Sequence, residues 1–295
     1  LKHWEREKQN TSFPLVLLLR DEGLLRLDDP VTQWVPELEG QPLPTADSRP
    51  PTLRQLLSMC AGFPEDDAWA DRLESLTEDE FTLLIREPKA FSHAPGVAFE
   101  YSNFGYSLLG RVIQNATGRP FREVVSDRII APLGLNSTRW SPVGIDPPRL
   151  ATGYACVDGK WVAQPVQAPG AFSAIGGLYS TVEDLAVWVA GFLDAWPARD
   201  GAADAHPLSR ASRREMQQVV TGMPLQFGSG RGPMRAQAVG YCLGLISSED
   251  LISGRTLEHS GGYPGFGSNM TWHPVCHVGV VALANGRYAG PGRAA

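Results

Sequence analysis

The sequence lacks long apolar runs, an excess of positive charge and any pair of cysteines at metal-binding spacing. Its longest apolar runs, such as 15–19 and 278–284, are far shorter than the ~20 residues that a membrane-spanning helix needs. The formal net charge is -6 at pH 7, whereas nucleic-acid binding requires a basic surface. These absences predict a globular chain with no membrane span and no nucleic-acid partner.

The distribution of cysteine and histidine does not resemble a metal site. The four cysteines are Cys60, Cys156, Cys242 and Cys276. No two of them stand at C-x-x-C spacing, and no mixed His/Cys cluster has the spacing of a zinc site. His273 and His277 are close in sequence, but Pro274 between them argues against a shared helix face. We predict small buried thiols and no metal, and leave disulfides open.

Hydrophobic periodicity divides the chain into a helical middle and a strand-rich end. Helical patterns occur at 13–22, 53–59, 81–87, 103–116, 120–130, 185–193 and 212–219. Thr77 and Glu80 form a capping-box pattern before the third of these. After Gly240, strand-like runs at 241–247, 267–273 and 278–285 alternate with glycine-rich turns. This order predicts an α+β chain with an antiparallel sheet at its C-terminal end.

Four stretches carry a more specific pattern. They are 19–36 (LRDEGLLRLDDPVTQWVP), 95–103 (PGVAFEYSN), 176–181 (GGLYST) followed by Asp184-Leu185, and the tetrad His259-Ser260-Gly261-Gly262. A single Tyr-x-Asn or His-x-Gly would occur by chance in a chain of this length. Together and in this order, the stretches resemble the serine β-lactamase, DD-peptidase and esterase family, which includes penicillin-binding-protein-like hydrolases. The resemblance covers nearly all of 15–288.

The resemblance implies a fold and a division of the chain. We expect a β-lactamase/DD-peptidase-like antiparallel sheet flanked by helices, with a mainly helical middle subdomain. Residues 1–30 and 236–295 would form the remnant of the sheet subdomain and residues 31–235 the helical one, within a single family domain. The family has further N-terminal strands, which we expect to be missing here. The apolar strand at 278–284 would then lie at a sheet edge, which predicts poor solubility for this chain expressed alone.

The resemblance also assigns catalytic positions at the start of the helix expected at 103–116. Acyl transfer needs a nucleophile, a base that takes its proton, and donors that hold the oxyanion. By resemblance, Tyr101 is the general base or proton relay. Asn103 would donate its side-chain amide to the substrate carbonyl or to the family's catalytic lysine.

The tetrad supplies the opposite wall of the expected site. By resemblance, His259 takes the place of a lysine in penicillin-binding relatives and bonds Tyr101 or the substrate carboxylate. Ser260, Gly261 and Gly262 would line the substrate, and the backbone N–H of Gly262 would be one of two oxyanion donors. Glycine at these positions lets substrate approach the strand closely.

The family's first motif, Ser-x-x-Lys, is absent from the chain. None of the four lysines has a serine three residues before it; they are Lys2, Lys8, Lys89 and Lys160. Counting back from Gly23 by the family spacing places Arg6 and Gln9 at the two positions. Pro14 would also break the family's long nucleophile helix. We therefore find no nucleophile.

Three interpretations follow from this departure. The chain is a fragment or has lost its true N-terminus; it is a pseudoenzyme that binds D-Ala peptides or β-lactam-like ligands; or it uses another nucleophile, such as Ser12 or Ser58. Whether it is an enzyme is left open, although we expect the chain as it stands to be inactive.

The remaining expectations concern ligands and location. Family substrates are small esters, β-lactams and D-alanyl peptides, and His259 leans toward esterase or D-amino-acid peptidase behaviour. No metal or organic cofactor is implied, and the oligomeric state is not given. The absence of a signal peptide favours the cytoplasm, but the chain begins at Leu1 rather than Met, so its N-terminus looks cut and the compartment stays open.

Overall fold

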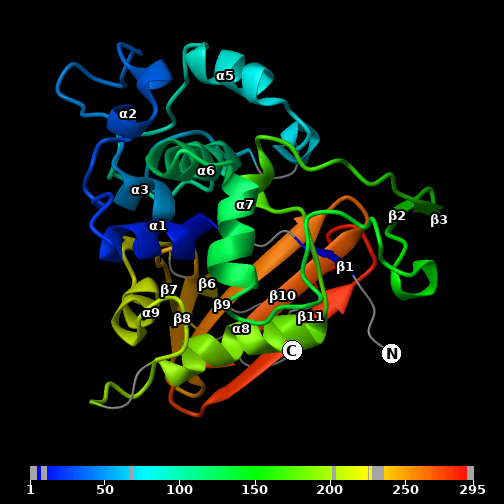
Figure 1. Cartoon of the computed structure of the whole chain (residues 1–295). Coiled ribbons are helices and arrows are strands. Elements are labelled where there is room, and N and C mark those ends of the chain that lie inside the picture. Colours follow the sequence, from blue (N-terminus) through cyan, green and yellow to red (C-terminus); the bar gives the residue numbers. More distant parts are fainter. Residues whose placement is uncertain are drawn as a thin grey trace.

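A computed structural model describes most of the chain (Figure 1). The described residues are 5–7, 12–66, 70–200, 204–224, 226–227 and 236–290. The longer helices are α1 (Ser12–Asp21), α2 (Val31–Trp34), α3 (Leu53–Leu57), α5 (Glu78–Arg86), α6 (Asn103–Thr117), α7 (Phe121–Val125), α8 (Val182–Asp194) and α9 (Arg210–Met216). Short helical turns are η1 (Pro36–Leu38), η2 (Asp71–Leu73), η3 (Ser126–Ile130), η4 (Pro147–Arg149) and η5 (Ser173–Ile175).

One antiparallel sheet dominates the second half of the chain. The strands are β1 (Glu5–Glu7), β2 (Tyr154–Val157), β3 (Lys160–Ala163), β4 (Leu178–Ser180), β5 (Thr221–Gly222), β6 (Gln226–Phe227), β7 (Ala236–Tyr241), β8 (Ile246–Asp250), β9 (Gly254–Tyr263), β10 (Phe266–His273) and β11 (Val278–Ala284). The main sheet has the order β11-β10-β9-β8-β7-β5, and β6 also pairs with β7. Two small sheets pair β1 with β4 and β2 with β3. In Figure 1, α8 lies along β11 while α1, α3 and α6 gather beyond the β7–β8 end, which confirms the α+β prediction.

Helix α1 is buried along most of its length. Leu15, Val16, Leu17 and Leu19 have no exposed surface, and Phe13 is 1% exposed. A helix that is apolar all round belongs in a core rather than on a surface. Each such side chain contributes roughly 1.5–3 kcal/mol on burial, so α1 anchors the surrounding helices to the sheet.

Capping residues explain where two helices start. Thr77 and Glu80 form the predicted capping box: Glu80 N–H donates to Thr77 Oγ1 at 3.2 Å, and Thr77 N–H donates to Glu80 Oε2 at 2.8 Å. Helix α5 consequently begins at Glu78, ahead of the apolar run at 81–87 on which the prediction was centred. Helix α6 is capped by Ser102, whose Oγ accepts from Gly105 N–H. Gly118 ends α6 with a φ of +65°, a conformation that glycine adopts without strain.

The predicted strand at 241–247 is wrong. β7 ends at Tyr241 and β8 begins at Ile246, and the intervening residues form a turn closed by Cys242 N–H donating to Leu245 O at 2.7 Å. Gly244 has a φ of +82°, and a side chain there would overlap the ring of Phe13. The run is apolar because the turn is buried against α1, and a buried turn has the same hydrophobic pattern as a buried strand.

The prediction that the cysteines are buried holds for two of the four. All four are free thiols. Cys60 and Cys242 are buried, and burial raises the pKa of Cys242 to about 12, which makes its thiol unreactive. The prediction of burial is wrong for Cys156 and Cys276, which lie exposed on β2 and in the β10–β11 turn.

A half-buried histidine packs beside helix α8. His206 lies 6.4 Å from Trp188 between ring centroids, and its Nδ1 accepts from Leu208 N–H at 3.0 Å. Burial, and to a smaller extent the charge of Arg213, lower the pKa of His206 to about 4. The carboxylates of Asp194 and Asp204 act in the opposite direction without reversing the shift.

We expect His206 to make the fold sensitive to mild acid. Its folded pKa lies below the ordinary value of 6.5, so the unfolded chain binds the proton more tightly. Its contribution to stability is complete above pH 6.5 and is lost as pH falls toward 4. After allowance for solvent screening, the loss amounts to about 2 kcal/mol. In urea titrations, the free energy of unfolding of His206→Gln should fall by about 2 kcal/mol less than that of wild type between pH 7 and pH 4.5. The exposed His277→Gln should match wild type, and a His206→Gln protein with unchanged pH dependence would contradict this account.

Strand β11 presents an apolar edge. Among the described residues it pairs only with β10, and Val278 and Val280 are 58% and 40% exposed. Unprotected apolar edges pair with other chains, and lysine on an edge strand blocks this pairing. We expect part of the wild-type protein to aggregate and Val280→Lys to raise the fraction eluting as monomer in gel filtration. Unfolding and ligand binding are measured on the monomeric fraction. Val187→Lys, the same change at a similarly exposed position of α8, should leave the monomer fraction at the wild-type level. A wild-type chain that is a soluble monomer and unfolds cooperatively would refute the expectation.

Candidate functional site

The first candidate residues stand at the start of helix α6. Asn103 is its first residue and is 1% exposed. The carboxylate of Asp66 accepts from Asn103 N–H at 2.6 Å, from Asn103 Nδ2 at 3.2 Å and from Phe104 N–H at 2.9 Å. An anion is stabilised at a helix N-terminus by the unpaired N–H groups and the helix dipole. Asp66 therefore fixes both the backbone and the side chain of Asn103.

Tyr101 lies just before α6 in an aromatic environment. It is partly buried against the core and close enough to Tyr241 to raise the pKa of that phenol, a shift caused mainly by burial. Phe99 packs on Tyr241 with 5.4 Å between ring centroids. Tyr106, one turn into α6, donates its hydroxyl to Leu57 O at 2.8 Å and is fully buried. Tyr101 thus lies near Tyr241, the last residue of β7.

The tetrad 259–262 lies on β9, where strand pairing becomes one-sided. β10 pairs with β9 along 257–263, but β8 pairs only with 254–258. Among the described residues, no strand is hydrogen-bonded to 259–262 on the β8 side, although β1 packs close to β9 and β10. Backbone N–H and C=O groups at such an edge are available to an extended ligand. The sheet register thus opens an edge at the predicted substrate-binding residues.

Side chains of the tetrad alternate between the two faces of β9. His259 is 5% exposed and lies opposite Met270, on the buried face. Ser260 is exposed, and its Oγ accepts from Asn269 Nδ2 at 2.9 Å. Burial raises the pKa of the neighbouring Glu258. The side chains of His259 and Ser260 accordingly lie on opposite faces of the strand.

Two tyrosine–carboxylate hydrogen bonds join the η2 region, 71–74, to the end of β9 and to the segment after β11. Tyr263 donates its hydroxyl to the carboxylate of Glu74, and Tyr288 donates to that of Asp71. Glu74 and Asp71 are 1% and 2% exposed. The ring of Tyr288 lies against Gly262 so closely that a side chain at position 262 would overlap it. The far end of the open edge is therefore closed by aromatic residues.

The structure brings the two groups of candidates to the same end of the sheet. Tyr241, beside Tyr101, pairs with Ile246 on β8, and Ile246 pairs with Glu258 on β9. Two strand spacings place Tyr241 about 10 Å from Glu258, which directly precedes His259. Tyr101 and the open edge thus lie near β7 and on β9, two strands apart in the sheet, although the sequences that supply them are far apart.

Ser58, proposed as a replacement nucleophile, is poorly placed. Its side chain is fully buried, and its hydroxyl donates to Arg54 O at 2.8 Å and lies 3.2 Å from Cys60 Sγ. A serine without access to solvent cannot attack a bound acyl group. The side chain of Ser12, the other alternative, lies outside the described residues.

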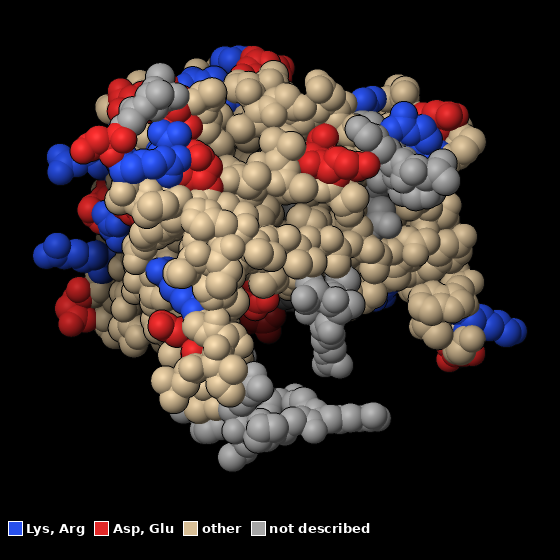
Figure 2. Space-filling view, turned by 90° about the horizontal axis from the view of Figure 1, so that it is seen from below, with Lys and Arg blue, Asp and Glu red and all other residues tan. Residues whose placement is uncertain are grey.

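The described part of the chain contains no group of three or more His, Cys, Asp or Glu side chains that could hold a metal ion. None of its helices is long and apolar enough to cross a bilayer. On the face shown in Figure 2, acidic and basic side chains are interspersed around a largely uncharged middle.

Comparisons with known proteins agree with this architecture. A family model described as Beta-lactamase matches residues 14–295. The D-alanyl-D-alanine-carboxypeptidase/endopeptidase AmpH of Escherichia coli K12 is 26% identical over 281 residues, covering 94% of this chain and 68% of AmpH. Penicillin-binding protein 4* of Bacillus subtilis is 24% identical, covering 92% of this chain and 57% of that protein. The octameric penicillin-binding protein homologue from Pyrococcus abyssi superposes with a TM-score of 0.82 at 26% identity, covering 99% of this chain and 64% of that structure.

Proposed function

The chain belongs to the β-lactamase family of serine hydrolases, and we propose that this 295-residue polypeptide binds acyl ligands of the family, β-lactams or D-alanyl peptides, without hydrolysing them. The open edge of β9 at 259–262 carries the proposal. An amide or lactam ligand would pair with this edge, and its carbonyl oxygen would accept from Gly262 N–H. This is the strand-addition mode of peptide recognition.

Asn103 and Tyr101 would form the other wall of the site. One N–H of the Asn103 amide donates to Asp66. A carboxamide has two such protons, and the second would donate to a ligand carbonyl that reaches this buried side chain, which is 1% exposed. Because Asp66 holds Asn103 rigidly, little side-chain entropy is lost when a ligand binds. Tyr101 would supply a hydroxyl to the same wall of the site as Asn103.

The proposed lack of hydrolysis rests on the missing Ser-x-x-Lys motif. Without Ser-x-x-Lys there is no serine beside a lysine to form the acyl intermediate, and no ammonium to favour ionisation of Tyr101. Of the two lysines among the described residues, Lys89 donates its ammonium to Leu84 O and Lys160 lies exposed on β3. Removal of a nucleophile costs hydrolases several orders of magnitude in rate.

Binding and chemistry are tested separately. Penicillin G and diacetyl-Lys-D-Ala-D-Ala are titrated by calorimetry, with the L-Ala-L-Ala diastereomer as matched control. Intact-mass spectrometry follows incubation with penicillin, and nitrocefin reports turnover. We expect reversible binding of the first two ligands, no penicilloyl adduct, and nitrocefin hydrolysis at the buffer rate.

Each other outcome removes a defined part of the proposal. A covalent adduct or turnover above buffer shows that another group acts as nucleophile and removes the non-catalytic assignment. No binding at millimolar ligand removes the acyl-ligand site itself. Equal binding of the L-Ala-L-Ala control removes the D-alanyl specificity.

A further inference from the structure

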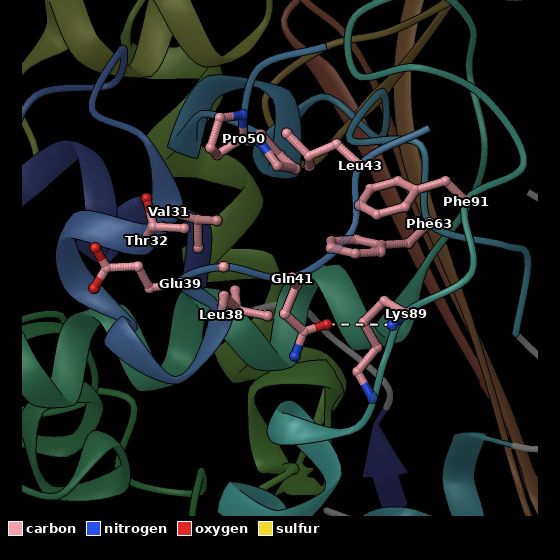
Figure 3. Close-up of a pocket in the computed structure, with 12 residues that line it drawn as sticks. Val31, Thr32, Leu38, Glu39, Gln41, Leu43, Pro50, Phe63, Lys89 and Phe91 are labelled. Carbon is pink, nitrogen blue, oxygen red and sulfur yellow. Dashed lines mark hydrogen bonds between the residues drawn. The ribbon is translucent and has the colours of Figure 1, made fainter. Parts of the chain in front are cut away.

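A pocket separate from the β9 edge lies between the α2–η1 segment and the loops that follow α3 and α5 (Figure 3). Its volume is about 360 Å³. The stacked rings of Phe63 and Phe91, with centroids 5.0 Å apart, form one side. Leu38, Leu43 and Pro50 stand around the remaining sides. The walls are therefore built from apolar side chains contributed by four separate segments.

Gln41 and the backbone N–H of Val31, two polar groups in the walls, are hydrogen-bonded within the protein. Both ends of the Gln41 amide are hydrogen-bonded: Nε2 donates to Ile85 O at 2.7 Å, and Oε1 accepts from Lys89 N–H at 3.2 Å. The backbone N–H of Val31 donates to Pro51 O at 2.8 Å. A ligand in this pocket would find few donors or acceptors to replace the water it leaves behind.

The charged groups at the pocket point outward. The Lys89 ammonium donates to Leu84 O and lies 5.0 Å from the centroid of the Phe104 ring. Figure 3 shows that the Lys89 side chain runs away from the pocket centre and that the Glu39 carboxylate and the Thr32 hydroxyl also point away from it. The pocket interior is thus uncharged, although two ionisable residues belong to its lining.

We propose that this pocket binds an uncharged, apolar ligand about the size of a bicyclic arene. Apolar cavities of about 150 Å³ stay dry and accept benzene, and this pocket has more than twice that volume. A charged ligand would lose its hydration without gaining a partner inside, which disfavours it. The flat ring of an arene would lie against the Phe63–Phe91 stack.

The pocket also borders the segment that positions Asn103. Phe63 makes an edge-to-face contact with Phe104 at 5.1 Å between centroids. Phe104 follows Asn103, and both donate backbone N–H groups to Asp66, three residues after Phe63. A ligand packed on Phe63 would therefore stabilise the loop that carries Asp66.

The test uses indole as the uncharged probe and indole-3-carboxylate as its charged counterpart. Calorimetry and thermal unfolding are measured on the full chain. We expect indole to bind and to raise Tm, and the carboxylate to bind at least about tenfold more weakly. Penicillin G should not displace indole, so the result is independent of the proposed acyl-ligand site.

Two variants locate the probe. Leu43→Trp fills the pocket and should abolish indole binding, whereas Leu251→Trp, at a fully exposed position, should leave it unchanged. Phe91→Ala removes one wall and should weaken binding at least about tenfold, which keeps the test decisive if Leu43→Trp does not fold. The proposal is overturned if indole does not bind, if the carboxylate binds equally well, or if a folded pocket variant retains wild-type affinity.

Discussion

Asp66→Ala should lower the free energy of unfolding by about 4 kcal/mol and weaken acyl-ligand binding. The carboxylate is 4% exposed and accepts from two backbone N–H groups and one side-chain amide, of Asn103 and Phe104. At the low end of the range for hydrogen bonds to a charged group, about 1.5 kcal/mol each, the three bonds are worth roughly 4.5 kcal/mol, and water that replaces the carboxylate recovers a small part of it. Urea unfolding at pH 7 measures the change.

A matched control separates this effect from loss of charge alone. Asp79 is a carboxylate in the first turn of α5, but it is exposed. Asp79→Ala should cost less than about 0.5 kcal/mol, since only the screened dipole interaction is lost. If Asp66→Ala changed stability as little as Asp79→Ala, Asp66 would not hold the start of α6, and the fixed orientation of Asn103 would lose its basis.

Gly262→Val should displace Tyr288 and close the open edge of β9. A side chain at this position overlaps the Tyr288 ring, so the ring has to leave and its hydrogen bond to Asp71 is lost. Overpacking and the lost bond to a carboxylate together cost about 3 kcal/mol. We expect the affinity for penicillin G to fall at least about tenfold, because the new side chain stands beside the backbone groups that would bind it.

The control for this change is Gly222→Val on β5. A side chain at Gly222 meets no atom within 4 Å, and its backbone is not left-handed. That variant should keep wild-type stability and affinity. Tyr288→Ala provides the complementary result, since it removes the ring without adding bulk at the edge. Undiminished penicillin binding by a folded Gly262→Val protein would exclude the β9 edge as the ligand site.

Local signals in the sequence predicted most of the helices. The Thr77–Glu80 capping box, Gly23 at the end of α1 and the apolar stripe of α6 each act within a few residues, so their outcome depends little on the rest of the chain. The helix expected at 120–130 is also present, although its second half, 126–130, is wound as a π-turn. The strand predicted at 241–247 was wrong because burial on all sides removes the alternation that distinguishes strands from turns.

The site residues that sequence analysis missed are joined by contacts between distant segments. Asp66 is 37 positions from Asn103, and Tyr288 is 217 positions from Asp71. Nothing in the run CAGFPED marks Asp66 as a helix cap, because the cap and its helix are not adjacent in sequence. The family resemblance supplied Tyr101, Asn103 and the tetrad, but not the groups that hold them. Their catalytic or binding roles remain predictions for the experiments above.

The register of β8 against β9 would also set a length limit on the ligands of the proposed site. One boundary is the buried turn at 242–245 that leads into β8, and the other is the pair of tyrosines anchored to η2. Between them lie four residues, which span about 13 Å in extended conformation. A dipeptide end or a fused bicyclic ring fits along that span, whereas a longer extended polypeptide has to bend away from the strand. The molecule would thus discriminate first by how far a ligand extends and only afterwards by its side chains.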